Sequence, residues 1–347
     1  EHPSSIGAFA RGSKELTLAR SRVVAQDGLP GVDGASPSDS SPAGGNGLVG
    51  HGSSCDAAYA CFLRGSAGNP GGAGAPGVAC GGGVTSGPGG NGGEGATQNG
   101  AKFAPSTGGG GGTPETAPGG AVDIHFGNPG VRGGNGARGA DGTNGTIRFT
   151  KDGLIVSDGA PGGSGAPGQG GGGGGGVSRI GDSDLVLAPS GGGGGAGGCP
   201  GRAGTPGTTG GSSIGIYSVD SVITLEGVDV ETGRGGRAGV GSFGSAPTAG
   251  GRGADGLFNR ILVNTNSQDV RGGDGGGGGA GGAAGVSGHG APGASIGVIS
   301  IGMAIKIRDG SVRTGAGGEG APELSDGAGG VLPATGAGES KDRLDVP

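Results

Sequence analysis

Runs of consecutive glycine restrict this chain most strongly. They include "GGGGGGG" at 170–176, "GGGGGAGG" at 191–198 and "GGDGGGGGAGGAAG" at 272–285, in a chain with 104 glycines among 347 residues. Ordering a glycine costs roughly 0.5–1 kcal/mol more than ordering an alanine. With 30% hydrophobic residues and no tryptophan, burial of side chains cannot offset that cost alone. We therefore expect glycine segments packed backbone against backbone and joined by hydrogen bonds, since only residues without a Cβ can approach so closely.

The glycine-rich stretches have similar lengths, which favours an ordered arrangement over random linkers. In a polyproline-II-like conformation at about 3.1 Å per residue, a stretch folded out and back would make two legs of about 30 Å. A collagen triple helix needs glycine only at every third position, so consecutive glycines instead suit a bundle whose legs are contacted on several sides. The stretches lie at 128–145, 160–176, 191–211, 234–256 and 273–293.

A different unit recurs between the glycine stretches. It reads "SSIGAFARGSKELTLARSRVVAQDG" at 4–28, "SSIGIYSVDSVITLEGVDVETG" at 212–233 and "ASIGVISIGMAIKIRDGSVRTG" at 294–315. Three short apolar pairs of period two within about 22 residues are typical of one coil of a parallel β-helix or solenoid. The expected core positions are Ile6, Leu16, Leu18, Ile214, Ile216, Ile223, Leu225, Val228, Val230, Ile296, Val298, Ile305 and Ile307.

Weaker copies of the unit are expected at 121–126, 146–159, 177–191 and 257–272. The sequence thus predicts an all-β and irregular fold with essentially no α-helix, because no segment sustains a 3.6-residue period. Parallel β-helix-like coils would alternate with ordered glycine-rich polyproline-II or polyglycine-II legs in one elongated repeat domain spanning 1–347, with a C-terminal tail at 331–347. Unrelated hairpins of a β-sandwich are the alternative.

The alternation of "GGNGG" and "GGAGG" tracts with strands such as "SSIGIYSVDSVITL" resembles PGRS-type and myxobacterial glycine-rich surface proteins. The glycine runs also resemble the polyglycine-II bundles of glycine-rich antifreeze proteins and phage tail-fibre adhesins. These resemblances cover most of the chain and imply an ordered extracellular glycine-rich fold. They carry over no catalytic residues, and the strand coils depart from the antifreeze type.

Four cysteines, Cys55, Cys61, Cys80 and Cys199, predict two disulfides formed in an oxidising compartment. Three pairings are open; "CDAAYAC" closes a short loop, which favours Cys55 with Cys61 and leaves Cys80 for Cys199. A zinc site is the rival interpretation, although no Cys-x-x-Cys pair or nearby histidine gives the usual ligand spacing.

The segment 29–120 is longer than any other glycine-rich stretch and contains three of the cysteines. It also holds Tyr59, Phe62 and Phe103, out of nine phenylalanines and tyrosines in the chain. A long insertion beside a repetitive scaffold is a natural place for a binding surface. The alternative is several ordinary glycine legs with one degenerate coil.

The remaining motifs give little chemistry. "GGRGADGLF" at 250–258 matches one calcium-binding nonapeptide, which makes Asp255 a weak calcium candidate, but such sites need tandem copies. "GADGTNG" at 139–145 suggests an ordinary turn. The four histidines are far apart in sequence, and no nucleophile elbow or zinc-protease motif is present. We expect no enzyme, no nucleotide site and no cofactor.

Charge and hydropathy favour a soluble exported protein. The net charge is −6, without a basic stripe for nucleic acid or an apolar run long enough for a membrane span. The first residue, Glu1, suggests a processed chain. The leading hypothesis is a secreted or cell-surface scaffold, fibre subunit or adhesin that self-associates by stacking the coils at 4–28 and 294–315. A ligand- or glycan-binding adhesin using 29–120 is the second hypothesis, and an ice-binding protein is the third.

Overall fold

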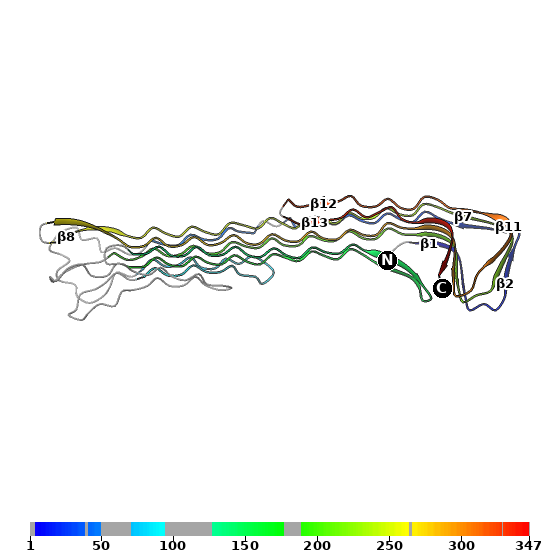
Figure 1. The fold of residues 1–347 in the computed structure, drawn as a ribbon, viewed down its shortest axis with the longest axis horizontal. Coiled ribbons are helices and arrows are strands. Elements are labelled where there is room, and N and C mark those ends of the chain that lie inside the picture. Colours follow the sequence, from blue (N-terminus) through cyan, green and yellow to red (C-terminus); the bar gives the residue numbers. More distant parts are fainter. Residues whose placement is uncertain are drawn as a thin grey trace.

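The computed structural model describes residues 4–38, 41–49, 71–93, 127–176, 189–263, 266–327 and 329–346. These residues form a long bundle of nearly parallel segments, with most strands gathered at one end (Figure 1). Within the described ranges there is no helix, and so none that could cross a membrane. The predicted all-β and irregular class without α-helix is therefore confirmed for this part of the chain.

Two parallel sheets form the strand-rich end, which we call the strand stack. Sheet A has the order β1-β6-β10-β14, and sheet B has the order β11-β7-β2, with β3 also paired to β7. Sheet A contains β1 (Ser5–Arg11), β6 (Ser213–Val219), β10 (Ser295–Ile301) and β14 (Ser340–Val346). Sheet B contains β2 (Leu16–Ala19), β3 (Arg22–Ala25), β7 (Ile223–Thr232) and β11 (Lys306–Arg313).

The strand register follows the sequence repeat. Ile214 pairs with Ile6 on one side and with Ile296 on the other. In sheet B, Leu225 lies between Leu18 and Ile307 in the same way. The three copies of the repeat are thus neighbours in space, and the copy at 212–233 is the middle one. One strand of sheet A was not predicted from the repeat: β14, which lies within the expected C-terminal tail, pairs with β10.

Two apolar clusters hold the strand stack together. One lies between the sheets and includes Ile216 and Val298 of sheet A with Leu225 and Val230 of sheet B. The other lies on the opposite face of sheet A, where Phe149 and Leu154 of a hairpin pack against it. The buried members of this second cluster are Ile214, Tyr217, Val219, Ala294, Ile296, Ile299 and Ile301.

Two expected core residues are exposed, which corrects the sequence analysis. Ile6 keeps 41% of its accessible surface and Ile307 keeps 39%. Both lie in strands at the edge of a sheet, β1 and β11, so no further strand covers them. Leu16 and Leu18 in the edge strand β2 are only half-buried for the same reason, whereas Ile305 is buried just before β11. The sequence repeat identifies equivalent positions but not which copy is outermost.

Two expected partial coils are antiparallel hairpins instead. β4 (Thr146–Thr150) pairs with β5 (Gly153–Ser157), and β8 (Phe258–Val263) pairs with β9 (Asn266–Arg271). In the first, the turn reaches Gly153, whose φ of +119° favours glycine. Each hairpin lets the chain reverse between two antiparallel legs. The other expected copies, at 121–126 and at most of 177–191, lie outside the described residues.

Each of the five stretches expected at 128–145, 160–176, 191–211, 234–256 and 273–293 is a single straight leg, not a stretch folded out and back. By contrast, 71–93 does fold back on itself, since Gly89 and Gly92 donate to the carbonyls of Ala75 and Gly72. Leg 127–145 donates hydrogen bonds to 271–289 at three-residue intervals. The first runs from the Gly127 N–H to the Arg271 carbonyl, and the last runs from the Gly145 N–H to the His289 carbonyl. The same leg accepts bonds from the antiparallel leg 158–176 over its whole length. The five stretches are therefore joined through strands and hairpins where the structure describes the connection, and each leg keeps one direction along the bundle (Figure 1).

The leg at 189–212 explains why glycines are consecutive. Its N–H groups at Gly191, Gly192 and Gly193 donate to three different legs, at Gly93, Gly273 and Leu48. The carbonyls of the same three residues accept from three further legs, at Gly72, Gly174 and Ala254. Six neighbours leave no side free. A Cβ on any of the three would lie closer than 3.0 Å to a neighbouring backbone oxygen, so consecutive glycines are required there.

Asn-Gly and Asp-Gly pairs connect parallel legs by a repeated pair of bonds. The glycine N–H donates to the carbonyl of a residue on the neighbouring leg. The N–H of that same residue donates back to the side chain of the Asn or Asp that precedes the glycine. Asn135 accepts from Ala280 at 2.9 Å while Gly136 donates to Ala280 at 2.8 Å. The stretch at 139–145, expected to be a turn, contains two such pairs within a straight leg. The side chains involved are Asp27, Asp33, Asn46, Asn135, Asp141 and Asn144.

Candidate functional site: the ends of the strand stack and a groove along the bundle

One end of the strand stack has an exposed apolar surface, which we call the β1 face. Phe9 is 55% exposed, and Ile6 of the same strand is also exposed. The ring of Phe9 rests against Tyr217 with ring centres 5.7 Å apart. Because β1 pairs only with β6, the backbone groups on its other edge have no strand partner among the described residues. An edge of this kind can pair with another strand.

The opposite end, formed by β14 and β11, is charged. β14 carries Lys341, Asp342, Arg343 and Asp345, and Arg343 forms an ion pair with Asp345 at 3.0 Å. In β11, Arg308 faces Glu226 of the neighbouring β7 at 3.4 Å. Charged side chains on an edge strand oppose its pairing with another chain. The two ends of the stack therefore differ in chemistry even though they belong to the same repeat.

Tyr217 supports the β1 face from beneath. Its hydroxyl donates to the carbonyl of Thr150 at 2.7 Å and accepts from the Thr150 N–H at 3.0 Å. Burial raises the pKa of the Tyr217 hydroxyl above its ordinary value, so the group stays neutral. These two hydrogen bonds hold the β4–β5 hairpin against sheet A and fix the position of the Tyr217 ring, against which Phe9 packs.

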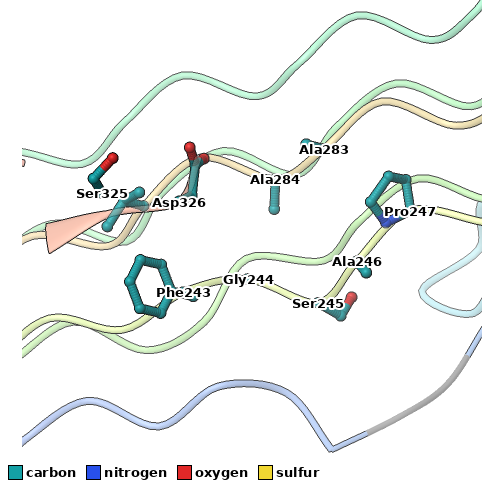
Figure 2. Close-up of a pocket in the computed structure, with 10 residues that line it drawn as sticks. Phe243, Gly244, Ser245, Ala246, Pro247, Ala283, Ala284, Ser325 and Asp326 are labelled. Atoms are coloured by element: carbon teal, nitrogen blue, oxygen red, sulfur yellow. The ribbon is translucent and has the colours of Figure 1, made fainter. Parts of the chain in front are cut away.

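A groove runs along the side of the bundle beyond the hairpin of β12 (Leu324–Ser325) and β13 (Val331–Leu332). Its cavity has a volume of about 340 Å³. Figure 2 shows Phe243 and Pro247 on one wall, Ala283 and Ala284 on the other, and Asp326 at the end. The walls are mostly apolar and small.

An ion pair anchors the hairpin at the end of the groove. Arg138 donates to Asp326 at 2.8 Å and to Asp141 at 2.5 Å. The Arg138 guanidinium holds the pKa of the Asp141 carboxyl below its ordinary value. Asp141 also accepts the Val286 N–H, so the same carboxylate links the hairpin anchor to the packing of two legs.

A disulfide joins Cys80 and Cys199, which are 119 residues apart. This is the pairing that remained for these two cysteines in the sequence analysis. Its position is inside the bundle, where Cys199 is fully buried in leg 189–212. Cys55, Cys61, Tyr59, Phe62 and Phe103 lie outside the described residues, so the binding role expected for these aromatics stays a prediction. The described parts of the insertion, 29–38, 41–49 and 71–93, are mainly legs.

The weak calcium candidate Asp255 is an exposed residue of leg 233–257. Across the ranges that the structure describes, no group of three or more His, Cys, Asp or Glu side chains could hold a metal ion. Sequence reasoning missed His289, which is completely buried and whose Nδ1 accepts the Gly241 N–H at 2.9 Å. Its place on the glycine leg, in register with Val286 and Ala283, was the available signal.

The strand stack therefore has one apolar and one charged end, and the bundle beside it has an unfilled groove. Comparison of this chain with protein-family models, with curated proteins and with solved structures found no match to any of them.

Proposed function

We propose that this protein is an extracellular or cell-surface structural or adhesive protein whose copies associate through the β1 face. The observation that carries the proposal is the exposed, unpaired edge of β1 with Phe9 and Ile6 on it. Proteins normally protect an edge strand with charge, as β14 does here. An apolar edge left open is most simply explained by a partner that covers it.

The difference between the two ends selects the mode of association. Stacking the units at 4–28 and 294–315 head to tail would place Phe9 against charged residues such as Lys341 and Arg343, which would lose their hydration. A two-fold arrangement instead places the β1 face of one copy on the β1 face of another, apolar against apolar. The two β1 strands would then pair antiparallel and join the two sheets A into one continuous sheet.

The repeated units support this role by making a rod of extended length. We propose that each strand unit is one coil of a parallel β-helix, as the paired registers of Ile6, Ile214 and Ile296 suggest. The legs, with hydrogen bonds every three residues, have the repeat of polyglycine II. Such a rod can hold a surface away from a cell or another molecule. The buried Cys80–Cys199 disulfide is suited to an oxidising, extracellular compartment.

Sedimentation velocity over a wide concentration range tests the proposal. The unaltered protein should form dimers, and Phe9→Lys should shift the dissociation constant upward at least tenfold by placing two charges in the interface. Phe258→Lys is the matched control, because Phe258 is exposed to a similar extent but lies at the opposite end of the bundle. A protein that stays monomeric at all concentrations, or equal effects of the two substitutions, would reject association through β1.

A further inference from the structure

Leg 314–323 shows how a further leg is added to the side of the bundle. Gly235 and Ala238 donate from leg 233–257 to the carbonyls of Ala316 and Glu319, at 2.9 and 2.8 Å. Gly318 in turn donates to the carbonyl of Gly293 at 2.8 Å. Leg 314–323 thus lies parallel to one neighbour and antiparallel to the other. It accepts hydrogen bonds from leg 233–257 and donates to leg 272–294.

Leg 314–323 stops at the β12–β13 hairpin, but the two legs on which it lies continue. The donor row that includes Gly235 and Ala238 extends to Gly244, Gly250 and Gly253. Among the described residues, the N–H groups of these three glycines have no hydrogen-bond partner. At the intermediate positions, Gly241 donates to His289 and Pro247 has no N–H to donate.

The acceptor row continues in the same way. The carbonyl of Gly293 accepts from Gly318, and three-residue steps back along leg 272–294 reach a series of carbonyls that accept no hydrogen bond from any described residue. Those carbonyls belong to Ser287, Ala284, Gly281, Gly278 and Gly275. The groove of Figure 2 lies between these donor and acceptor rows, and it is closed at one end by Ser325 and Asp326.

We propose that this groove binds one further glycine-rich leg, supplied by another polypeptide chain. The leg would run parallel to 233–257 and antiparallel to 272–294, continuing the line of leg 314–323. Three-residue spacing on both walls requires a ligand with a carbonyl and an N–H at every third residue. A β-strand has a period of two and cannot match both rows, and an all-proline chain has the correct period but no N–H.

The walls restrict the ligand to small residues on the sides facing them. Ala284 and Val286 are buried. The two legs that form the walls also pack closely on each other, since a Cβ on Gly250 would lie against the carbonyl oxygen of Gly278, so the walls have no room to move apart for a large side chain. Phe243 is 37% exposed at the rim, where it can cover an alanine or proline of the ligand. This surface is separate from the β1 face, and the proposal does not depend on association through β1.

A labelled peptide titrated against the full chain tests the groove. The probe is the twelve-residue peptide APGGSGAPGQGG, which copies residues 160–171 of the chain, and binding is followed by fluorescence anisotropy. We expect saturable binding by this peptide. A twelve-residue polyproline peptide, and a copy of the probe with its glycines replaced by valine, should bind at least tenfold more weakly.

Two substitutions locate the site. Ala283→Leu fills the groove and should weaken binding at least tenfold, whereas Ala35→Leu, on an exposed part of leg 26–38 that does not line the groove, should leave it within twofold. Phe243→Ala provides a second groove variant that removes only a half-covered rim side chain. Absence of saturable binding, equal binding by polyproline, or unchanged binding after both groove substitutions would overturn the proposal.

Discussion

The strand stack and the leg bundle bury their backbones in different ways. In β6 and β10 every residue is buried, and the interior is filled by side chains such as Ile214, Ile216 and Val298. In leg 189–212 the residues at 189–201 are also all buried, but the neighbours are backbone atoms of other legs. One region is stabilised chiefly by apolar contact, and the other by hydrogen bonds that require the absence of side chains.

The two regions meet at Thr232 and Gly233. Thr232 ends β7 in sheet B, where its neighbours are other strands. At Gly233 a Cβ would already lie too close to atoms of Asp27. The Gly233 N–H still donates to Ala25 of β3, and from Arg234 on the chain donates to legs. The comparison teaches that a glycine-rich segment can be as fully packed as a hydrophobic strand. A strand is destabilised when side-chain atoms are removed, whereas a leg is destabilised when they are added.

The largest expected effect concerns the strand stack. Ile216→Ala removes a fully buried side chain between the sheets and should lower the free energy of unfolding by about 4 kcal/mol. Ile307→Ala is the control, because that side chain is partly exposed on an edge strand, and it should cost about 1 kcal/mol. Denaturant unfolding followed by circular dichroism measures both, and equal losses would contradict the described packing.

A smaller loss is expected when a methyl group is added to the bundle. Gly194→Ala places a Cβ against the carbonyl oxygen of Gly171 and should cost about 3 kcal/mol. At Gly45 the nearest atom to such a Cβ is 3.6 Å away, so Gly45→Ala should be nearly neutral. The same denaturant titration compares them. If Gly194→Ala also proved neutral, the tight contacts around leg 189–212 would not exist in solution.

The Asn-Gly pairs should contribute less. Asn135→Leu leaves the Ala280 N–H without its acceptor and should lower the free energy of unfolding by about 1 kcal/mol. Asn135→Asp keeps an oxygen in the same place and should recover most of that loss. Amide hydrogen exchange at Ala280 gives a local measurement, and unchanged protection in Asn135→Leu would argue against the bond.

The smallest effect is a dependence on pH. Burial lowers the pKa of His289 below its ordinary value of about 6.5. The folded state therefore disfavours the protonated imidazole, and stability that is present above pH 6.5 is lost as the pH falls below it.

His289→Asn supplies a side-chain oxygen for the Gly241 N–H and should remove this part of the pH dependence. Unfolding measured from pH 7 to pH 5 tests it. Asp141 does not interfere, since its pKa is lowered from an already acidic value. Parallel pH profiles for the variant and the unaltered protein would be evidence against a buried neutral histidine.

Much of the fold was predictable from local patterns. The repeat at 212–233 identified strands and core positions because apolar residues of period two have one face to bury, and glycine runs at 170–176 and 191–198 identified legs contacted on several sides. The hairpins at 146–159 and 257–272 were mistaken for coils, since short strands with apolar residues look alike whether they pair in parallel or antiparallel. The pairing of Asp141 and Asn144 with another leg was missed because Asp-Gly and Asn-Gly also form turns.

The sequence by itself determined where the chain forms strands and where it forms legs, because side-chain size and period act locally. Only the tertiary structure decided which repeat is outermost and therefore that Ile6, Phe9 and Ile307 are exposed while Ile214 and Ile296 are buried. It also decided that leg 314–323 ends while the two legs against which it packs continue, which leaves the groove beside Phe243 open. Both outcomes depend on how many neighbours each segment has, and that number is a property of the whole assembly of segments.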